Sequence, residues 1–476
     1  MAATKVSIVG GGLAGLAAGV ALARRGVPVQ VFEANAKAGG CSATSIEHGF
    51  TFHDGALFLT MPGLLDAAFA RIGLDRAHEV PIGRMDRPYA AFLPDGVTAA
   101  VEGRSVLVAR DGRPAQVAAE ADLERLAARW RPVMRLFFED LMLQPLSALR
   151  LLTHGWRYLP MLRGTVGAEL RRAIHDEAVQ SALGGVVLYA GLAPDALPIP
   201  SVMGIVALLE EGFFLPEGGM GRIPDALARA FTSAGGELHL GARVEKIVVE
   251  GGRARGVEVA GTGHVPSDVV LSTASGMLTF GSLVGAQHIS GALRRKVRSA
   301  RLSHKAVGIQ LGLANRIPAP AHVNCVLPPL AEQGRVFDPA QADRWLSFMV
   351  PTVTQPDLAA GGGSIVELFC PLDPAVSLDP DGVERIADRA IAALASRYPL
   401  DIAVRRVRGP EQFRADMNLY GGALYGLSPA VNPLSLFAHD TPIRGLYLAG
   451  QTTYPGYGVS GATMSGVLAA ERIARA

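Results

Sequence analysis

Cysteine is scarce in this chain of 476 residues, which contains only Cys41, Cys325 and Cys370, far apart in the sequence. None belongs to a C-x-x-C pair or to a cysteine–histidine spacing that binds zinc, so the sequence offers no metal site of that kind. An odd and sparse set of cysteines is typical of a reducing compartment, where disulfides do not form. We therefore predict a cytoplasmic protein with no structural disulfide and no bound metal.

An excess of charge of one sign is also lacking. Lys and Arg together number 45 and Asp and Glu number 43, which leaves a formal net charge of +2. A protein that binds nucleic acid in general presents a strong positive excess to the phosphates. The even balance therefore argues against a nucleic-acid partner.

No uninterrupted apolar run reaches the length of a membrane span, although hydrophobic residues make up 49% of the chain. The nearest candidate, residues 178–209, is broken by Pro194, Asp195 and Pro198. The first predicted strand begins within a few residues of Met1, so we expect no signal peptide. Any contact with a membrane would then be peripheral.

The most informative segment is a glycine-rich turn between an apolar strand and an Ala/Leu-rich helix in residues 5–19. Gly10, Gly12 and Gly15 have the G-x-G-x-x-G spacing, which permits a tight turn, close approach to a pyrophosphate and close packing of helix on strand. The helix start offers free N–H groups to phosphate. Glu33 ends the next strand, where a carboxylate accepts hydrogen bonds from a ribose. This order predicts a bound dinucleotide.

A second dinucleotide motif is lacking. The glycines at 361–363 precede a predicted strand instead of following one, so their order is wrong for a phosphate-binding turn. We therefore expect no separate nicotinamide domain.

The rest of the chain is predicted to alternate between helical and mixed segments. Residues 90–209 have mostly helical periodicity, and 276–405 form a second mixed segment. The other expected elements are a helix at 225–234, strands at 237–240, 243–249 and 254–259 with a hairpin turn at Gly251 and Gly252, a buried parallel strand at 269–275, strands at 306–313 and 364–369, a helix at 381–397, and a strand at 445–451 before a final helix.

We expect two domains, each assembled from separated stretches. The cofactor domain comprises 1–89, 213–275 and 406–476, and the substrate or cap domain comprises 90–212 and 276–405. The predicted fold class is α/β plus α+β, with a Rossmann-like domain and a discontinuous domain of mixed sheet and helices.

Several segments together resemble the FAD-dependent amine oxidase and phytoene desaturase superfamily, and within it the carotenoid desaturase–isomerase branch. The resemblance rests on residues 9–15, on Gly39-Gly40 with 49–52, on 216–224, and on 446–450 with 455–459. These segments come from both ends and the middle of the chain. The resemblance implies non-covalently bound FAD in a glutathione-reductase-type domain, with a smaller substrate domain beside it.

The resemblance also implies which residues bind FAD. The ADP half, the pyrophosphate and ribityl chain, the adenine and the flavin ring would be held by Gly10, Gly12, Leu13, Ala14, Gly15, Glu33, Ala34, Lys37, Gly40, Cys41, Ser42, Gly55, Ala56, Leu57, Val244, Gly450, Gln451, Gly458, Val459 and Ser460. The last three would lie at the start of the final helix, where a helix N-terminus favours the negative charge of a reduced flavin.

Two residues depart from the pattern of the family. The arginine that usually follows the Gly-Gly pair is Cys41 here, and His53 stands where an aspartate is common, with Asp54 next to it. Cys41 is interpreted as a small packing residue or as a reactive thiol, and His53 as a loop histidine or as an acid–base group. The catalytic residue stays unassigned, and His53, Asp54 and Tyr457 are the candidates.

Aromatic residues near the C-terminus suggest a wall beside the flavin. Tyr454 and Tyr457 lie among glycines, which mark close approach of a ligand; ordinary core aromatics are the alternative. Residues 420–426 resemble a family segment on the substrate side, although a glycine-rich loop without ligand contact is the alternative.

Residues 141–168 contain no acidic side chain but include Arg150, Arg157 and Arg163 beside leucines, Trp156 and Tyr158. Arginines toward lipid phosphates and aromatic rings toward the acyl chains are typical of a membrane interface. We predict peripheral contact of 141–168 with the inner face of the membrane; a solvated cap helix is the alternative.

The function that the resemblance implies is an FAD-dependent oxidoreductase, a desaturase, dehydrogenase or isomerase, acting on a hydrophobic polyene or isoprenoid by hydride transfer to flavin N5. Oxygen or a quinone would accept the electrons. The alternatives are a flavin amine oxidase or a natural-product tailoring dehydrogenase acting on a compact polar substrate, and a non-catalytic isoprenoid carrier with the same fold. Substrate identity and oligomeric state are left open.

Overall fold

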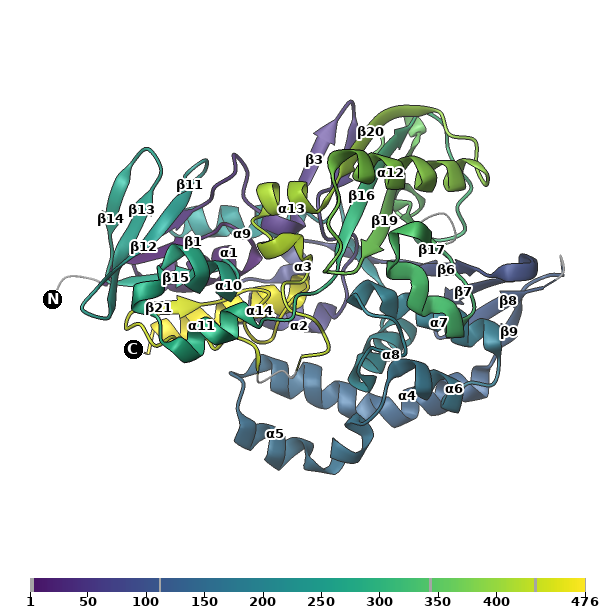
Figure 1. The fold of residues 1–476 in the computed structure, drawn as a ribbon, viewed down its shortest axis with the longest axis horizontal. Coiled ribbons are helices and arrows are strands. Elements are labelled where there is room, and N and C mark those ends of the chain that lie inside the picture. The colour runs from purple at the N-terminus through teal and green to yellow at the C-terminus, as the bar shows by residue number, and fades with distance from the viewer. Residues whose placement is uncertain (1–3, 111–112, 342–344, 432–434, 476) are drawn as a thin grey trace.

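The protein has two lobes, one built on a parallel sheet and one on a larger mixed sheet (Figure 1). The computed structural model describes residues 4–110, 113–341, 345–431 and 435–475. Both ends of the described chain lie in the lobe with the parallel sheet (Figure 1).

The parallel sheet has the order β11-β2-β1-β15-β21, and every neighbouring pair in it is parallel. The strands that form it are β1 (Val6–Val9), β2 (Val29–Phe32), β11 (Glu237–His239), β15 (Val269–Ser272) and β21 (Leu446–Leu448). The predicted return of a buried strand near 269–275 to the first unit is confirmed, because Val6–Val9 pairs with Val269–Ser272.

Three helices pack around this sheet: α1 (Leu13–Ala23), α9 (Arg222–Ser233) and α14 (Val459–Ile473). Every residue of α1 is buried, which explains why its sequence is apolar all round instead of amphipathic. Gly466 allows α14 to cross α1 closely, because a Cβ there would overlap the carbonyl oxygen of Ala14.

The second lobe contains a nine-stranded sheet, which also carries the one correction that the fold makes to the predicted elements. The stretch 89–118 is not helical but forms four of the nine strands. In order across the sheet these are β20 (Ile402–Arg408), β16 (Lys305–Leu313), β19 (Ser364–Leu372), β18 (Leu346–Met349), β17 (Val323–Val326), β6 (Tyr89–Phe92), β7 (Thr98–Glu102), β8 (Ser105–Ala109) and β9 (Gln116–Ala118).

The prediction of mostly helical structure over 90–209 is wrong for the described residues of 90–118, whose short strands alternate only weakly. Strands β7 and β8 alternate between buried and less buried residues, as expected for half-buried strands. Strand β6 pairs with β17, more than two hundred residues later, and local propensity cannot predict such a pairing.

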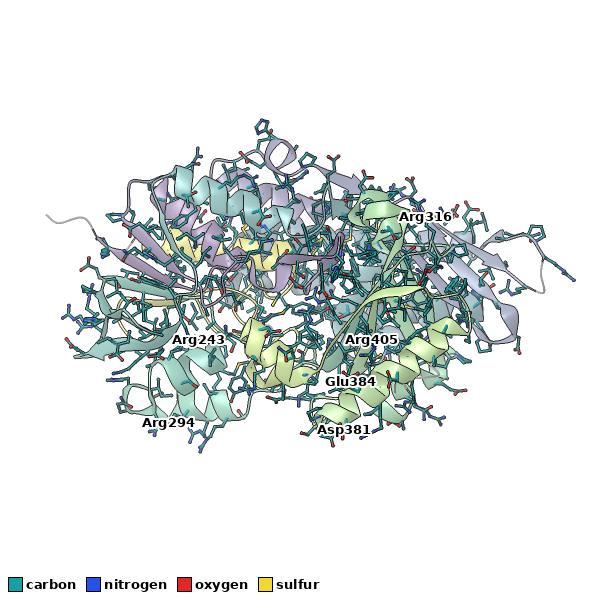
Figure 2. The ribbon with its side chains drawn as sticks, turned by 90° about the horizontal axis from the view of Figure 1, so that it is seen from above. Arg243, Arg294, Arg316, Asp381, Glu384 and Arg405 are labelled. Carbon is teal, nitrogen blue, oxygen red and sulfur yellow. The ribbon has the colours of Figure 1, made fainter. Side chains whose placement is uncertain are left out.

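Helices cover this second sheet and extend below it (Figure 1). The helices are α4 (Glu120–Arg135), α5 (Ala148–Gly155), α6 (Val166–Ala173), α7 (Glu177–Val187), α8 (Val202–Glu210) and α12 (Pro380–Ala395). Arg405 on β20 forms ion pairs with Glu384 at 2.7 Å and Asp388 at 2.8 Å, both on α12, and so fixes β20 against that helix (Figure 2).

Smaller elements connect the two lobes or extend from them. They are β3 (Thr44–Glu47), β4 (Phe50–His53), β5 (Ile82–Arg84), β10 (Phe214–Pro216), β12 (Val244–Glu250), β13 (Arg253–Val259), β14 (Gly263–Pro266), α2 (Pro62–Arg71), α3 (Arg76–Glu79), α10 (Gly276–Leu278), α11 (Gly291–Arg298) and α13 (Pro410–Met417). The predicted hairpin at Gly251 and Gly252 is confirmed, since it joins β12 to β13 and both glycines have positive φ.

The predicted domain bounds stay a prediction, and the boundary between 405 and 406 falls inside β20. Helix α5 lies at the lower edge of the molecule, away from both sheets (Figure 1). Within the ranges described, none of the helices combines the length and the apolar character needed to cross a bilayer.

Candidate cofactor and substrate site

The carboxyl ends of the parallel strands bring the predicted cofactor residues to one edge of the sheet. Gly10 follows β1, Glu33 follows β2, and Gly450 follows β21, although these residues are separated by up to 440 positions. Since β2 and β15 flank β1 on opposite sides, this edge is the switch point at which open α/β sheets bind ligands.

The glycine turn has the geometry that a pyrophosphate requires. Gly10 has φ of +101°, and a Cβ there would lie 2.5 Å from Oγ1 of Thr273. Gly15 packs against the carbonyl oxygen of Gly10, so a side chain would push α1 away from β1. Gly12 caps α1 without a side-chain hydrogen bond, which leaves the first N–H groups of the helix, beginning at Leu13 and Ala14, for a ligand anion.

Glu33 is buried and held in place by the backbone. Its Oε2 accepts a hydrogen bond from the Gly11 N–H at 2.8 Å, and its Oε1 accepts one from the Asn35 N–H at 2.9 Å. A carboxylate has about four acceptor positions, so two remain for ribose hydroxyls. Ala34 follows it directly, and Val244 begins β12 just after the loop in which Ala242 donates its N–H to the Glu33 carbonyl.

The loop at 37–42 lies directly against the glycine turn. The Gly39 N–H donates to the Gly11 carbonyl at 2.9 Å, and a Cβ on Gly40 would lie 3.3 Å from the Gly12 Cα. Lys37 Nζ donates to the Thr44 carbonyl at 3.1 Å, and the Ser42 hydroxyl donates to the Met220 carbonyl at 3.3 Å. The Lys37 and Ser42 side chains therefore also hold the loop in place.

Cys41 and the segment at 55–57 form the next part of the site. The Ala56 N–H donates to the Cys41 carbonyl at 2.7 Å, and Gly55 is so close to that carbonyl that a Cβ would overlap it. The Leu57 carbonyl lies 3.4 Å from the Nε2 of His322. Burial raises the pKa of the Cys41 thiol to about 11, although the side chain is open on one side. A thiol of this kind is protonated at neutral pH and is not a nucleophile.

The last helix contributes a second uncapped N-terminus. Gly458 begins α14 with φ of +86° and no side-chain cap, so the N–H groups of the first turn face a potential ligand. Gly456 is buried, yet a Cβ there would meet no heavy atom within 4 Å. Ser460 donates to the carbonyl of Thr60 at 3.0 Å and so ties the turn to the start of α2. Val459 is buried beside it.

The phosphate side of the last strand is tied to α14. The Gly450 N–H donates to the Ser465 hydroxyl at 3.0 Å, and a Cβ on Gly450 would lie 3.2 Å from the Thr273 carbonyl. Gln451 lies next to Gly426, with its Nε2 3.5 Å from the place of a Cβ there. The uncapped helix starts, the positive-φ glycines and the open space at Gly456 fit a flavin dinucleotide.

A row of aromatic rings leads away from this edge into the second lobe. Its ring centroids are separated by 4.6 Å between Tyr457 and Tyr425, and by 4.2 to 5.9 Å along the rest of the row. We call this row the aromatic path; it consists of Tyr457, Tyr425, His304, Phe369, Tyr189, Phe58 and Phe213.

The aromatic path lies deep and carries no charge. Burial raises the pKa of Tyr457 to about 12 and raises that of Tyr425 and Tyr189 as well, yet all three side chains keep open surface. Burial lowers the pKa of His304 to about 3, so its ring is neutral. Deep, neutral, partly open rings are suited to an apolar ligand. Tyr454 and Tyr457 were the two tyrosines expected to form a wall, and of these Tyr457 stacks against Tyr425.

Two of the three candidate catalytic residues are held by neighbouring side chains. His53 Nδ1 lies 3.0 Å from Oε2 of Glu367, and its Nε2 is buried without a partner and faces Gly219. Asp54 accepts a hydrogen bond from Ser45 at 2.8 Å and lies 3.4 Å from Arg406. The third candidate, Tyr457, lies on the aromatic path.

Sequence reasoning missed three residues of the site. Thr273 donates its hydroxyl to the Val9 carbonyl at 2.8 Å and supports the glycine turn. Arg408 donates to the Asp54 carbonyl at 2.8 Å, and His304 joins Tyr425 to the rest of the aromatic path. Thr273 could have been found, because it follows the strand that was expected to return to this sheet.

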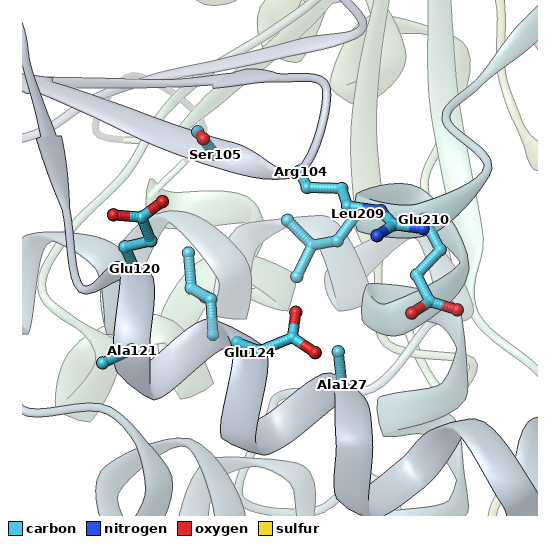
Figure 3. Close-up of a pocket in the computed structure, with 9 residues that line it drawn as sticks. Arg104, Ser105, Glu120, Ala121, Glu124, Ala127, Leu209 and Glu210 are labelled. Atoms are coloured by element: carbon cyan, nitrogen blue, oxygen red, sulfur yellow. The ribbon is translucent and has the colours of Figure 1, made fainter.

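A separate pocket of about 400 Å³ opens between β8, α4 and α8 (Figure 3). It is lined by both charged and small apolar side chains, namely Arg104, Ser105, Glu120, Ala121, Leu123, Glu124, Ala127, Leu209 and Glu210. None of these residues belongs to the predicted cofactor set or to the aromatic path, so this pocket is not the cofactor site.

Curated relatives of the chain are carotenoid enzymes. It is 27% identical to a zeta-carotene-forming phytoene desaturase from Myxococcus xanthus, with 98% of this chain and 93% of that one covered. It is 26% identical to a lycopene-forming phytoene desaturase from Pseudescherichia vulneris, with 97% of each chain covered.

Solved structures share the fold. An oxidoreductase from Methanosarcina mazei matches with a TM-score of 0.66 at 19% identity, covering 99% of this chain and 100% of that one. Putrescine oxidase bound to putrescine matches with a TM-score of 0.66 at 16% identity, covering 99% of each chain. The predicted fold class, a Rossmann-like domain with a discontinuous mixed domain, is confirmed.

The family comparison covers more than half of the chain. Residues 13–277 match the family described as flavin containing amine oxidoreductase, which confirms both the predicted cofactor and the predicted reaction class. The near full-length likeness to phytoene desaturases confirms the resemblance on which the sequence analysis rested. The chain therefore belongs to the flavin-containing amine oxidoreductases, is similar to their phytoene desaturases, and is an FAD-dependent oxidoreductase.

Proposed function

We propose that this oxidoreductase acts on a long, apolar polyene or isoprenoid, from which it removes hydrogen as a desaturase. The aromatic path carries the proposal, because its neutral rings run from the cofactor edge into the second lobe and match an extended apolar chain. The names of the curated relatives, which are phytoene desaturases, support the same class of substrate.

Bound FAD supplies an acceptor for a hydride at its N5 atom. The chain orients the substrate and excludes water: Tyr457 and Tyr425 present a flat apolar surface at the cofactor edge, and the uncapped start of α14 favours negative charge near the flavin. Tyr457, with its pKa raised to about 12 by burial, stays protonated and is not a base. The proton lost with the hydride therefore passes to a base other than Tyr457 or to water at the edge of the site.

We also propose that the predicted residues hold FAD in a non-covalent complex. The glycine turn and the α14 start would hold the phosphates and the flavin edge, and Glu33 would hold the ribose. The support is the geometry of three glycines. A Cβ on Gly10 or Gly450 would meet Thr273, and Gly12 leaves the backbone at the start of α1 open to a ligand. For the electron acceptor we propose oxygen or a membrane quinone.

The amine oxidase alternative is less well supported by the site. Amine oxidases of this resemblance typically have a tryptophan–tyrosine cage late in the chain, whereas Trp130, Trp156 and Trp345 all lie before residue 346. Gln451 stands where amine oxidases of this resemblance typically have a glutamate.

Contact with the inner face of a membrane is proposed from an exposed apolar ridge on α5 and the turn that follows it. The side chains of Leu149, Leu152, Trp156 and Leu159 are 71%, 57%, 63% and 48% exposed, and their spacing places them on one helical face. Such a face is typical of helices that lie in the lipid interface. It would let the enzyme take an apolar substrate directly from the bilayer.

The substrate class is tested by anaerobic reduction. FAD-loaded protein is mixed with vesicles that contain phytoene, and separately with a panel of primary amines. We expect phytoene to bleach the yellow flavin and to gain double bonds, and the amines to do neither. Bleaching by an amine would establish the alternative, and product of unchanged mass with altered double-bond geometry would show an isomerase. FAD-loaded protein that phytoene does not bleach contradicts the proposal.

Membrane contact is tested by flotation with anionic vesicles. A variant with Leu152→Glu and Trp156→Glu should stay in the bottom fraction. Leu240 is an exposed leucine on the other lobe, so Leu240→Glu should float with the vesicles as the parent does. Equal flotation of the parent and the double variant would exclude the ridge as the contact.

A further inference from the structure

We propose that Arg408 supplies the positive charge that faces the flavin ring, in place of the arginine that the family pattern expects at position 41. The inference rests on the FAD site and is independent of the proposed polyene substrate. It follows from where β20 ends, from what the guanidinium contacts, and from how its charge is balanced.

Strand β20 delivers Arg408 from the second lobe to the cofactor edge. Successive residues of a strand point to opposite faces, and Arg405 points to α12, where it is held by Glu384 and Asp388 (Figure 2). Arg408 is an odd number of positions away and therefore faces the opposite side. The two ion pairs of Arg405 fix the strand, so the position of Arg408 does not depend on a flexible loop.

The guanidinium of Arg408 contacts Asp54, which directly precedes the segment that touches Cys41. Its Nη2 donates to the Asp54 carbonyl at 2.8 Å. Gly55 follows directly, and both Gly55 and the N–H of Ala56 contact the Cys41 carbonyl. The charge of Arg408 partly opposes the effect of burial on the thiol of Cys41, which agrees with this proximity.

The Arg408 guanidinium makes no short ion pair among the described residues, although its carbon lies 5.1 Å from the centre of the Phe413 ring. Its side chain is 13% exposed, and its ion pair with Asp54 is long, at 3.7 Å. That carboxylate also serves Arg406 at 3.4 Å. Among the described residues, the five N–H groups of the Arg408 guanidinium make one hydrogen bond, to the Asp54 carbonyl. The other N–H groups are available to a ligand.

A cation held in this way favours an anionic ligand. Burial lowers the pKa of Arg408, whereas the charges of Asp54, Asp416 and Glu367 oppose the shift. Binding of an anion beside the guanidinium would recover part of the cost of burying it. A flavin ring becomes negative near N1 when it is reduced, so Arg408 should stabilise the reduced cofactor more than the oxidised one.

The test uses Arg408→Gln in the full-length protein, with FAD affinity measured for both redox states. A neighbouring opposite charge changes a protonation or charge equilibrium by about tenfold or more. We expect reduced FAD to be weakened about tenfold more than oxidised FAD, which lowers the two-electron midpoint potential by about 30 mV. Binding of ADP, which lacks the ring, to the apoprotein should not change.

Three further variants keep the result interpretable. Arg406 shares the Asp54 carboxylate with Arg408 but contacts the hairpin at Ser45, so Arg406→Gln should change the potential much less than Arg408→Gln does. Arg408→Lys should retain part of the effect, which separates charge from folding. Cys41→Arg added to Arg408→Gln should restore the potential, because it returns a cation to the position where the family pattern has an arginine.

The inference is overturned if Arg408→Gln folds and binds FAD with an unchanged midpoint potential. It is equally overturned if ADP affinity falls as much as FAD affinity, because the charge would then serve the diphosphate. Neither result would affect the proposed polyene substrate, which is judged by phytoene bleaching in the parent protein.

Discussion

The close crossing of α1 and α14 leads to a sharp prediction about a single methyl group. Both helices begin at the cofactor edge, and Gly466 sets their separation, since a Cβ there would overlap the Ala14 carbonyl oxygen and lie 2.8 Å from its carbonyl carbon. The neighbour is backbone and cannot rotate away. We expect Gly466→Ala to separate the two helix starts and to weaken both folding and FAD binding.

The magnitude follows from two opposing terms. Replacing Gly by Ala within a helix stabilises by up to about 1 kcal/mol, whereas overpacking a filled core costs about 1–3 kcal/mol or more. Gly204 in α8 is the matched control, because a Cβ there meets no heavy atom within 4 Å. Gly204→Ala should therefore stabilise slightly, and because the helix gain is common to both variants, they should differ by the overpacking cost of about 1–3 kcal/mol.

The assay is urea unfolding followed by the release of flavin fluorescence, with FAD affinity measured in parallel. Gly466→Ala should unfold at lower urea than the parent and bind FAD more weakly, and Gly204→Ala should do neither. If both variants unfold at the same urea concentration, the close crossing does not control stability and the reasoning is refuted.

Three other predictions concern single side chains. Glu33→Gln should weaken FAD binding by about 1.5–3 kcal/mol through loss of charge-assisted hydrogen bonds, measured by titration of the apoprotein; unchanged affinity would show that the ribose lies elsewhere. Burial holds the pKa of His304 at about 3 in the folded protein, below its ordinary value of 6.5, so between these values the unfolded state binds more protons and acidification destabilises the fold. Acidification from pH 6.5 to about pH 5 should therefore cost the His304→Phe variant about 2 kcal/mol less stability than it costs the parent. If the unfolding free energy of parent and variant falls equally with pH, the ring is not buried and neutral. Burial raises the pKa of Cys41 to about 11. Cys41 should therefore react with iodoacetamide at pH 8 on the order of a hundredfold more slowly than free cysteine, as followed by mass spectrometry. Labelling at the rate of free cysteine would exclude that pKa shift.

Local patterns predicted the parts of this fold that depend on neighbouring residues. The strand, turn and helix around Gly10, the hairpin at Gly251 and Gly252, and the final helix were all predicted correctly. Each depends on turn chemistry and periodicity within about twenty residues. The stretch 90–118 was predicted wrongly: its first strand, β6, pairs with β17, more than two hundred residues later, and β7, β8 and β9 extend the sheet from it as antiparallel neighbours.

The sequence by itself determined that the cofactor is a dinucleotide, because a glycine turn and an acidic residue at a set spacing constrain the backbone that meets one, and the resemblance implied FAD. It also determined that the two ends of the chain would meet, through the segments at 5–19 and 445–460. Only the tertiary structure decided what lies beside the flavin site. Arg408 and Tyr425 reach Cys41 from more than 360 positions away, and His304 joins them from a third segment. Such contacts are made by packing between distant elements, for which a sequence carries no local signal.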